Sequence, residues 1–223
     1  MLSAYRTSPS PGPAYLPQGL ASLVEPAAVS VHGWRLANVQ QPDSVVVVGI
    51  GNIGLLAILA ARALGAQDII AIGKYAPRQE LARHYGASLV LEPQDPALQT
   101  RILERSNGLG AALVIEAAGS ASSLRTAVDV ARKGGKIVIL GVFHQDVALD
   151  YRSILMMEKQ LIGSVIYQRQ DFAEAMNIIA QSNIDPARHI TAELPLSDIV
   201  SHGFIPLCED KAAHIKIQIH PND

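Results

Sequence analysis

A glycine-rich loop between a strand-like run and a helix-like run restricts the fold of this chain more than any other feature. Residues 44–48 read Ser-Val-Val-Val-Val, residues 49–54 read Gly-Ile-Gly-Asn-Ile-Gly, and residues 53–64 are apolar with helical spacing. Glycines also occur in plain strand-to-helix turns, but a strand, this loop and a helix in this order are typical of a dinucleotide-binding unit. We therefore predict a Rossmann-type fold for this part of the chain.

Each glycine of the loop has a predicted role. We expect Gly49 to permit the tight turn, Gly51 to let the backbone approach a pyrophosphate, and Gly54 to let the helix pack closely against the strand. The start of the helix, with Asn52 and Ile53, offers free backbone N–H groups to the phosphates. These five residues form the centre of the predicted cofactor site.

Strand-like and helix-like segments alternate through the middle of the chain. Each crossover helix must return the chain to the same edge of a sheet, so the alternation predicts the α/β class with a doubly wound parallel sheet and helices on both faces. A composition with 49% hydrophobic but only 4% aromatic residues suits such buried strands. The predicted strands are 68–72, 88–91, 112–116 and 136–140, and the predicted helices are 77–85, closed by Gly86, 97–105 and 121–133, followed by a break at Gly134-Gly135.

The chain divides into four predicted segments. Prolines and serines indicate that residues 1–22 are a tail or linker. Residues 23–43 connect this tail to the sheet through a helix over 23–36, in which Pro26 stands in the first turn. Residues 44–168 form the predicted dinucleotide-binding domain, and residues 169–223 a segment that serves a second domain. The later predicted strands are 161–165, 190–194 and 215–219, and the later predicted helices are 171–181 and 196–207.

Charge, hydropathy and cysteine content argue against several classes of partner. The 18 basic and 20 acidic residues give a net charge of −2 without runs of one sign, so we expect no nucleic-acid or membrane partner. The longest apolar stretch is too short to cross a bilayer, and the N-terminus lacks the pattern of a secretory signal. A lone cysteine, Cys208, fits a reducing compartment. We therefore expect a cytoplasmic protein.

The end of the second predicted strand bears on the choice of cofactor. An acidic residue about twenty positions after the loop would bind the ribose 2′-hydroxyl of NAD, but this chain has Gly73 there. Lys74 beside it and Arg78 one helical turn later are cations suited to a 2′-phosphate. We predict NADP(H) in preference to NAD(H). The alternative interpretation is that both cations are solvated charges at a helix start.

Several short motifs resemble those of one superfamily. They are Leu23-Val24-Glu25-Pro26, the loop at 49–54, Glu80-Leu81-Ala82-Arg83 before Gly86-Ala87, Leu161-Ile162-Gly163-Ser164, Asp171-Phe172, Ile190-Thr191 and Gly203-Phe204. Together they are similar to the zinc-dependent medium-chain dehydrogenase/reductase, or alcohol dehydrogenase, superfamily. Within it the chain looks most like the butanediol and sorbitol dehydrogenase branch. The resemblance runs from about Leu16 to Pro221.

The resemblance implies an oxidoreductase that transfers a hydride between a secondary alcohol, butanediol-like, and NAD(P). The expected partners are the nicotinamide dinucleotide and a small alcohol or ketone. It also adds cofactor residues that the glycine loop alone does not indicate. Ala117 and Ala118 would line the cofactor cleft, and the backbone of Leu140, Val142, Gly163 and Ser164 would face the nicotinamide carboxamide.

The resemblance also implies a zinc-holding N-terminal domain ahead of the segment present here. We expect that domain to be missing, with a remnant of the catalytic part at the C-terminus. Zinc catalysis needs about three protein ligands, so we expect no zinc to bind this chain alone. Glu25 matches a family carboxylate near the zinc, although a single helical carboxylate is more simply a first-turn charge. Ala192-Glu193 replaces a family His-Arg pair, which places an anion where a cation would approach the pyrophosphate.

Two functions remain open at this point. The chain is the cofactor-binding part of an alcohol or polyol dehydrogenase, or it is a truncated non-catalytic module that binds NADP(H). A zinc-independent quinone reductase is disfavoured, because the matching motifs belong to the zinc branch. By resemblance, two such domains join through the sheet edge near 161–165, so we expect a homodimer or higher oligomer.

Overall fold

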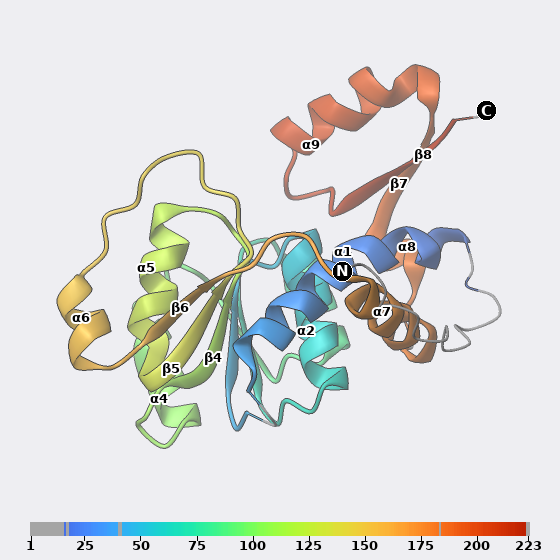
Figure 1. Cartoon of the computed structure of the whole chain (residues 1–223). Helices are drawn as coiled ribbons and strands as arrows, with labels where there is room; N and C mark the ends of the chain where they lie inside the picture. The colour runs from blue at the N-terminus through green and yellow to red at the C-terminus, as the bar shows by residue number, and fades with distance from the viewer. Residues whose placement is uncertain (1–15, 17, 40–41, 183, 222–223) are drawn as a thin grey trace, which may run out of the picture.

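The computed structural model describes residues 16, 18–39, 42–182 and 184–221. Its centre is a parallel six-stranded sheet in the order β3-β2-β1-β4-β5-β6, with helices on both sides (Figure 1). The strands are β1 (Val45–Val48), β2 (Ile69–Ile72), β3 (Leu89–Leu91), β4 (Ala111–Glu116), β5 (Ala131–Ile139) and β6 (Gln160–Gly163). The predicted doubly wound α/β fold is confirmed.

Strand β1 shows why the sheet needs two covering layers. Its four valines are all buried, and successive side chains point to opposite faces. Val45 and Val47 belong to one hydrophobic cluster, and Val46 and Val48 to the other. The first cluster includes α1 (Gln18–Ala37), α2 (Asn52–Ala63), α3 (Ala76–Tyr85) and α7 (Arg169–Gln181), whereas the second includes α4 (Leu98–Arg105), α5 (Ala121–Val130) and α6 (Tyr151–Met156).

Helix α1 begins earlier than predicted. It starts at Gln18, so Pro26 lies inside the helix and the prediction that Pro26 stands in the first turn was wrong. The predicted end of the tail at residue 22 therefore falls within a helix, while residues 1–15 lie outside the described part. Buried Leu23 and Ala27 pack into the core on both sides of the proline. Local propensity alone would start the helix at Pro26. The packing of Leu23 and Ala27 stabilises the additional turns before the proline.

Strand β5 also differs from its prediction. It begins at Ala131, so α5 ends at Val130 and the glycine pair at 134–135 lies within the strand. Ala131 pairs with Ala111, but the next pair joins Lys136 to Leu113, so β5 bulges between the two pairs. Gly134 has a φ of +66°, which an L side chain rarely adopts, and this allows the bulge. The predicted break is thus an irregularity inside a strand.

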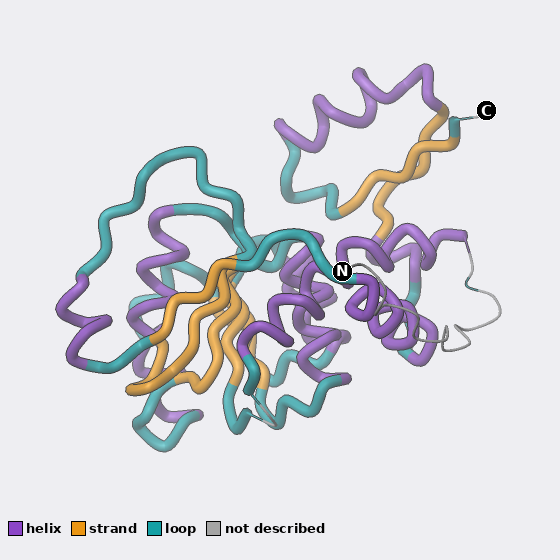
Figure 2. Tube along the Cα trace, in the orientation of Figure 1, coloured by secondary structure: helices purple, strands orange, loops and turns teal. Residues whose placement is uncertain are grey.

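The C-terminal residues form a smaller unit beside the sheet. Strands β7 (Ile190–Pro195) and β8 (Lys216–His220) pair in parallel, apart from the six-stranded sheet (Figure 2). The predicted helix at 196–207 is instead a 3₁₀ turn (196–198), a π-helical turn (199–204) and α9 (Ile205–Glu209). Pro206 lacks the N–H that a continuous α-helix would use at this point. The short helix α8 (Pro186–His189), like α6, was not predicted.

A buried carboxylate joins this C-terminal segment to the first helix. Asp171 of α7 is fully buried, with His32 Nδ1 at 2.8 Å from Oδ2 and Arg35 Nε at 2.8 Å from Oδ1. The same carboxylate accepts the backbone N–H of Gln168 at 2.7 Å and so caps α7. These contacts fix α7 against α1. Within the described residues, no helix is both long and apolar enough to cross a membrane.

Candidate functional site

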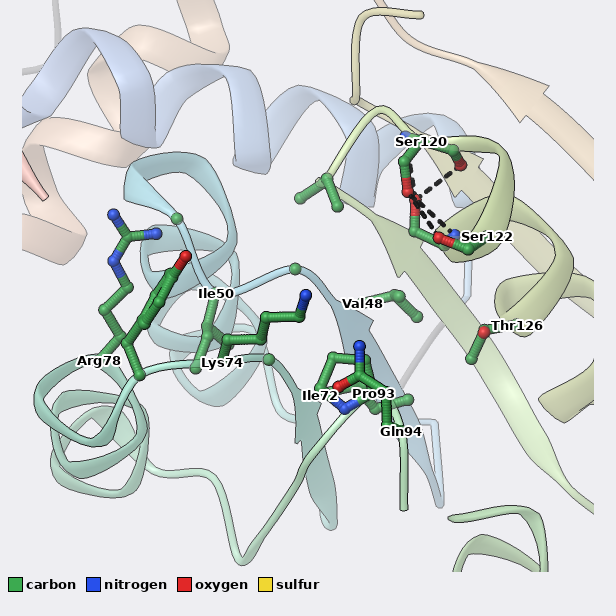
Figure 3. Close-up of a pocket in the computed structure, with 17 residues that line it drawn as sticks. Val48, Ile50, Ile72, Lys74, Arg78, Pro93, Gln94, Ser120, Ser122 and Thr126 are labelled. Carbon is green, nitrogen blue, oxygen red and sulfur yellow. Dashed lines mark hydrogen bonds between the residues drawn. The ribbon is translucent and has the colours of Figure 1, made fainter. Parts of the chain in front are cut away.

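A cleft of about 530 Å³ opens at the carboxyl ends of β1, β2 and β4 (Figure 3). The carboxyl edge of a parallel sheet is where ligands bind in doubly wound folds. The cleft is lined by the glycine loop, the end of β2, the turn after β3 and the first turns of α5. Its lining residues are Val48, Gly49, Ile50, Gly51, Ile72, Gly73, Lys74, Tyr75, Arg78, Pro93, Gln94, Ala117, Ala118, Ser120, Ser122, Ser123 and Thr126.

The loop glycines meet three different geometric requirements. Gly49 has a φ of +99°, and a Cβ there would lie 2.7 Å from Ala118 Cβ. A Cβ at Gly54 would lie 1.7 Å from the carbonyl oxygen of Gly49, so only glycine lets α2 pack this close to the loop. A Cβ at Gly51 would meet no atom of the described residues within 4 Å. Gly51 therefore borders open space, as the approach of a ligand requires.

The start of α2 gives the cleft an electropositive end. Gly51 is the N-cap residue, and glycine has no side chain to accept from the first N–H groups of the helix. These N–H groups and the helix dipole favour an anion at this position. Asn52 and Ile53 lie in this first turn but are not among the residues that line the cleft.

The end of β2 excludes a side chain at residue 73. A Cβ at Gly73 would lie 2.1 Å from Ile50 Cγ1, and Ile50 is itself buried. The neighbouring Lys74 is exposed, and its side chain extends into the cleft (Figure 3). Within the described part of the chain, no ion pair holds the Lys74 ammonium. The cleft therefore has a cation, and no carboxylate, at this corner.

Unlike Lys74, Arg78 is held by hydrogen bonds to the C-terminal segment. Its Nη2 donates to the carbonyl oxygens of Lys211 and, at 2.6 Å, of His214, and its guanidinium lies 5.2 Å from the ring centre of Tyr75. Burial lowers the pKa of Arg78, and a smaller effect of Tyr75 opposes the change. The structure thus places Arg78 at the cleft, as the sequence suggests, but also ties it to the C-terminal segment.

The wall of the cleft contains polar residues that the sequence analysis did not identify. Ser120 and Ser123 form a reciprocal cap of α5: the Ser120 hydroxyl accepts from the Ser123 N–H at 3.1 Å, and the Ser123 hydroxyl accepts from the Ser120 N–H at 3.0 Å. Ser122 lies in the first turn of α5, and Thr126 lies one turn further along the same wall (Figure 3). A serine three residues before another at a helix start is a capping signal that points to this turn.

Ala117 and Ala118 line the cleft where β4 ends, and a buried carboxylate shapes their turn. Glu116 is fully buried, and its Oε1 accepts the backbone N–H groups of Ala118 and Gly119, both at 2.9 Å. A Cβ at Gly119 would lie 2.4 Å from the carbonyl oxygen of Val142. The turns after β4 and β5 are therefore in close contact.

The remaining predicted cofactor residues lie beyond the lining of this cleft. Leu140 and Val142 follow β5, and Gly163 and Ser164 follow the adjacent edge strand β6. Val142 is exposed, a Cβ at Gly163 would meet no described atom within 4 Å, and the buried Ser164 hydroxyl has no partner among the described residues. These residues lie along the same carboxyl edge of the sheet, on strands further from the glycine loop.

The two acidic residues singled out from the sequence lie in different surroundings. Glu193 on β7 is paired with His220 on β8, with 2.9 Å between Oε2 and Nε2. Glu25 is exposed on α1. Among the described residues, no cluster of three or more His, Cys, Asp or Glu side chains could hold a metal ion. The described side chains therefore do not form a zinc site.

Comparison with known proteins places the chain in a family. Residues 52–181 match the family model described as zinc-binding dehydrogenase. The chain is 34% identical over 182 residues to D-xylulose reductase A of Aspergillus oryzae, which covers 80% of this chain and 51% of that protein. It is 29% identical over 201 residues to (R,R)-butanediol dehydrogenase of Bacillus subtilis, covering 90% and 57% of the two chains.

Solved structures agree with this placement. The crystal structure of 2R,3R-butanediol dehydrogenase from Bacillus subtilis superposes with a TM-score of 0.84 at 28% identity, over 94% of this chain and 60% of that one. A putative zinc-binding dehydrogenase from Sinorhizobium meliloti 1021 bound to NADP gives a TM-score of 0.79 at 27% identity, over 93% and 60%. The chain spans about half the length of the curated relatives it matches. It belongs to the zinc-binding dehydrogenase family of the medium-chain dehydrogenase/reductase superfamily, is similar to its butanediol dehydrogenases and xylulose reductases, and covers mainly the NAD-binding region.

Proposed function

We propose that the cleft binds a nicotinamide dinucleotide and that the chain is the cofactor-binding part of an alcohol or polyol dehydrogenase. The observation that carries this proposal is the start of α2. Its first N–H groups have no side-chain acceptor at Gly51, and they adjoin open space rather than packed side chains. A pyrophosphate fits such a site because it supplies acceptors and negative charge together.

The proposed cofactor is NADP(H) in preference to NAD(H). Ile50 leaves no room at Gly73 for a carboxylate that would bind a ribose 2′-hydroxyl. The Lys74 ammonium beside it supplies positive charge for a 2′-phosphate. Arg78 would assist only if one of its bonds to the C-terminal carbonyls were exchanged for the phosphate. Lys74 is therefore the main determinant of the preference.

The proposed reaction oxidises a secondary alcohol of the butanediol type. A bound dinucleotide would supply the hydride acceptor for the carbinol carbon; a C=O bond would form there as the hydroxyl proton left to a base or to water. On this chain, the backbone around Leu140, Val142, Gly163 and Ser164 would hold the carboxamide. The close contact of the turns at Gly119 and Val142 supports a continuous surface from the glycine loop to these residues.

A second candidate is a binding module that holds NADP(H) without chemistry. Glu193 favours it, since the resemblance implies a cation at this position and the chain presents a carboxylate. Oxidation of butanediol, followed by NADPH absorbance, would separate the two candidates.

We also propose that two copies associate through the free edge of β6. This strand ends the sheet, and Leu161 on it is partly exposed. The adjoining apolar side chains Val165, Ile166, Leu155 and Met156 are exposed as well. An unpaired strand edge with apolar neighbours is a favourable surface for pairing with a second chain.

Calorimetric titration with NADPH and NADH tests the cofactor proposal. We expect NADPH to bind about tenfold more tightly, the effect of one good charge-assisted contact. Lys74→Ala should remove this difference, whereas Lys133→Ala should keep it, because Lys133 pairs with Glu158 outside the cleft. Equal affinities for the two nucleotides in the parent chain would contradict the NADP(H) preference.

A further inference from the structure

A chain of three hydrogen-bonded polar side chains, two of them buried, connects the glycine loop to the C-terminal unit. His189, the last residue of α8, is fully buried, and its Nε2 lies 2.8 Å from Oδ1 of Asn52 at the start of α2. Its Nδ1 lies 2.9 Å from the hydroxyl of Tyr85, the last residue of α3. The Tyr85 and His189 rings stack with 5.8 Å between their centres and 15° between their planes. The three residues come from three elements far apart in sequence.

The hydrogen-bonding groups fix the direction of each bond in this chain. The Asn52 Oδ1 is an acceptor only, so His189 must donate from Nε2. In a neutral imidazole the other nitrogen is then an acceptor, so the Tyr85 hydroxyl donates to Nδ1. Burial lowers the pKa of His189 to about 4, which keeps the ring neutral near pH 7. The arrangement therefore has one set of donors and acceptors under ordinary conditions.

These bonds orient the Asn52 amide and leave one of its groups free. Because Oδ1 accepts the hydrogen bond from His189, the amide is held with its Nδ2 group turned away from that histidine. No acceptor for Nδ2 is present among the described residues. Asn52 is not itself one of the residues that line the cleft, but it directly follows Gly51, which is. A donor held at this position, beside the free backbone N–H groups of α2, suits a phosphate oxygen.

We propose that the Asn52 side-chain amide donates to the cofactor pyrophosphate and that His189, supported by Tyr85, is a positioning residue that holds this amide in its donating orientation. The proposal rests on the proposed function, because it assumes that a dinucleotide occupies the cleft. Without the His189 bond the Asn52 side chain would rotate, and binding would have to order it again. The fixed amide makes the phosphate site preformed.

Binding of two ligands to matched variants tests the proposal. NADPH contains a pyrophosphate, whereas adenosine 2′-monophosphate has the adenosine and the 2′-phosphate without it. Asn52→Ala should weaken NADPH binding about tenfold, as expected for the loss of a hydrogen bond to a charged group. His189→Leu should weaken it about fivefold, because the Asn52 amide is then no longer held in its donating orientation. His189→Gln should restore most of the affinity, because its amide N–H can take the place of Nε2–H. None of the three changes should alter binding of adenosine 2′-monophosphate.

A double-mutant cycle gives the decisive comparison. If His189 acts through Asn52, the Asn52→Ala/His189→Leu protein should bind NADPH no more weakly than Asn52→Ala alone. Additive losses, or equal losses for adenosine 2′-monophosphate, would overturn the proposal. Should His189→Leu fail to fold, Tyr85→Phe provides the same test with one oxygen removed. A parent chain that binds neither ligand would refute the proposed function instead.

Discussion

Two glycines of the same loop should respond in opposite ways to one added methyl group. Gly51 has φ −78° and ψ −167°, which alanine adopts freely, and its Cβ would meet no described atom within 4 Å. A Cβ at Gly54 would overlap the backbone oxygen of Gly49, at 1.7 Å. We predict that Gly51→Ala loses dinucleotide binding with its stability retained, whereas Gly54→Ala loses stability.

The sizes of these effects follow from the geometry. At Gly51, alanine is the poorer N-cap residue by up to about 1 kcal/mol, but it also restricts the unfolded chain by about 0.4–1 kcal/mol, so the two effects nearly cancel. Its methyl group occupies the space through which a phosphate reaches the first N–H groups. Loss of one such bond weakens binding about tenfold or more. At Gly54, the overlap with backbone should cost about 3 kcal/mol, roughly 6–12 °C in Tm for a chain of this size.

Thermal unfolding and calorimetric titration of both variants provide the assay. The predicted result for Gly51→Ala is a melting temperature close to the parent value with NADPH affinity at least tenfold weaker. Gly54→Ala should melt well below the parent. Unchanged NADPH affinity in Gly51→Ala would refute the assignment of this loop to the pyrophosphate, and unchanged melting of Gly54→Ala would refute the packing argument.

Three further predictions concern the rest of the chain. Asp171→Ala should lower the free energy of unfolding by about 3 kcal/mol, because the contacts of this buried carboxylate with His32, Arg35 and the N–H of Gln168 are lost together. A loss under about 1 kcal/mol in urea unfolding would argue that these contacts do not hold α7 against α1. Burial lowers the pKa of His189 to about 4 from the ordinary 6.5, so an unfolded chain binds more protons between these values and stability should fall by about 3 kcal/mol as pH drops from 6.5 to 4. Urea unfolding across this range should show that slope, and His189→Gln should flatten it. Leu161→Arg should convert a β6-paired dimer to monomer in sedimentation velocity, and a parent chain that is monomeric at all concentrations would rule out this pairing.

The central α/β unit could be predicted from the sequence because its signals are local. The β-branched run at 45–48, the glycine loop and the helix end at Gly86 each depend on neighbouring residues only. Gly86 closes α3 with a φ of +118°, a conformation that glycine adopts readily. The position of Lys74 and Ala117 at one cleft could also be predicted from the sequence, because parallel strands end at the same edge of a sheet.

The features that escaped prediction depend on contacts between distant residues. The early start of α1 is stabilised by core packing around Pro26, and the length of β5 by pairing of Ala131 with Ala111. The bonds of Arg78 to carbonyls at 211 and 214 join segments more than 130 residues apart. The bond between Asn52 and His189 spans 137 positions and leaves no pattern in the sequence.

Amide chemical shifts during an NADPH titration would test most directly whether the cleft is the dinucleotide site. We predict that the largest changes fall on residues 49–54 at the start of α2 and on residues 73–74 at the end of β2, with smaller changes at Ala117 and Ala118. The structure has a second hollow, of about 740 Å³, between α2, α3 and α7, lined in part by Arg62 and His84. Changes concentrated in this second hollow, with the glycine loop unaffected, would show that the cleft at the glycine loop is not the dinucleotide site.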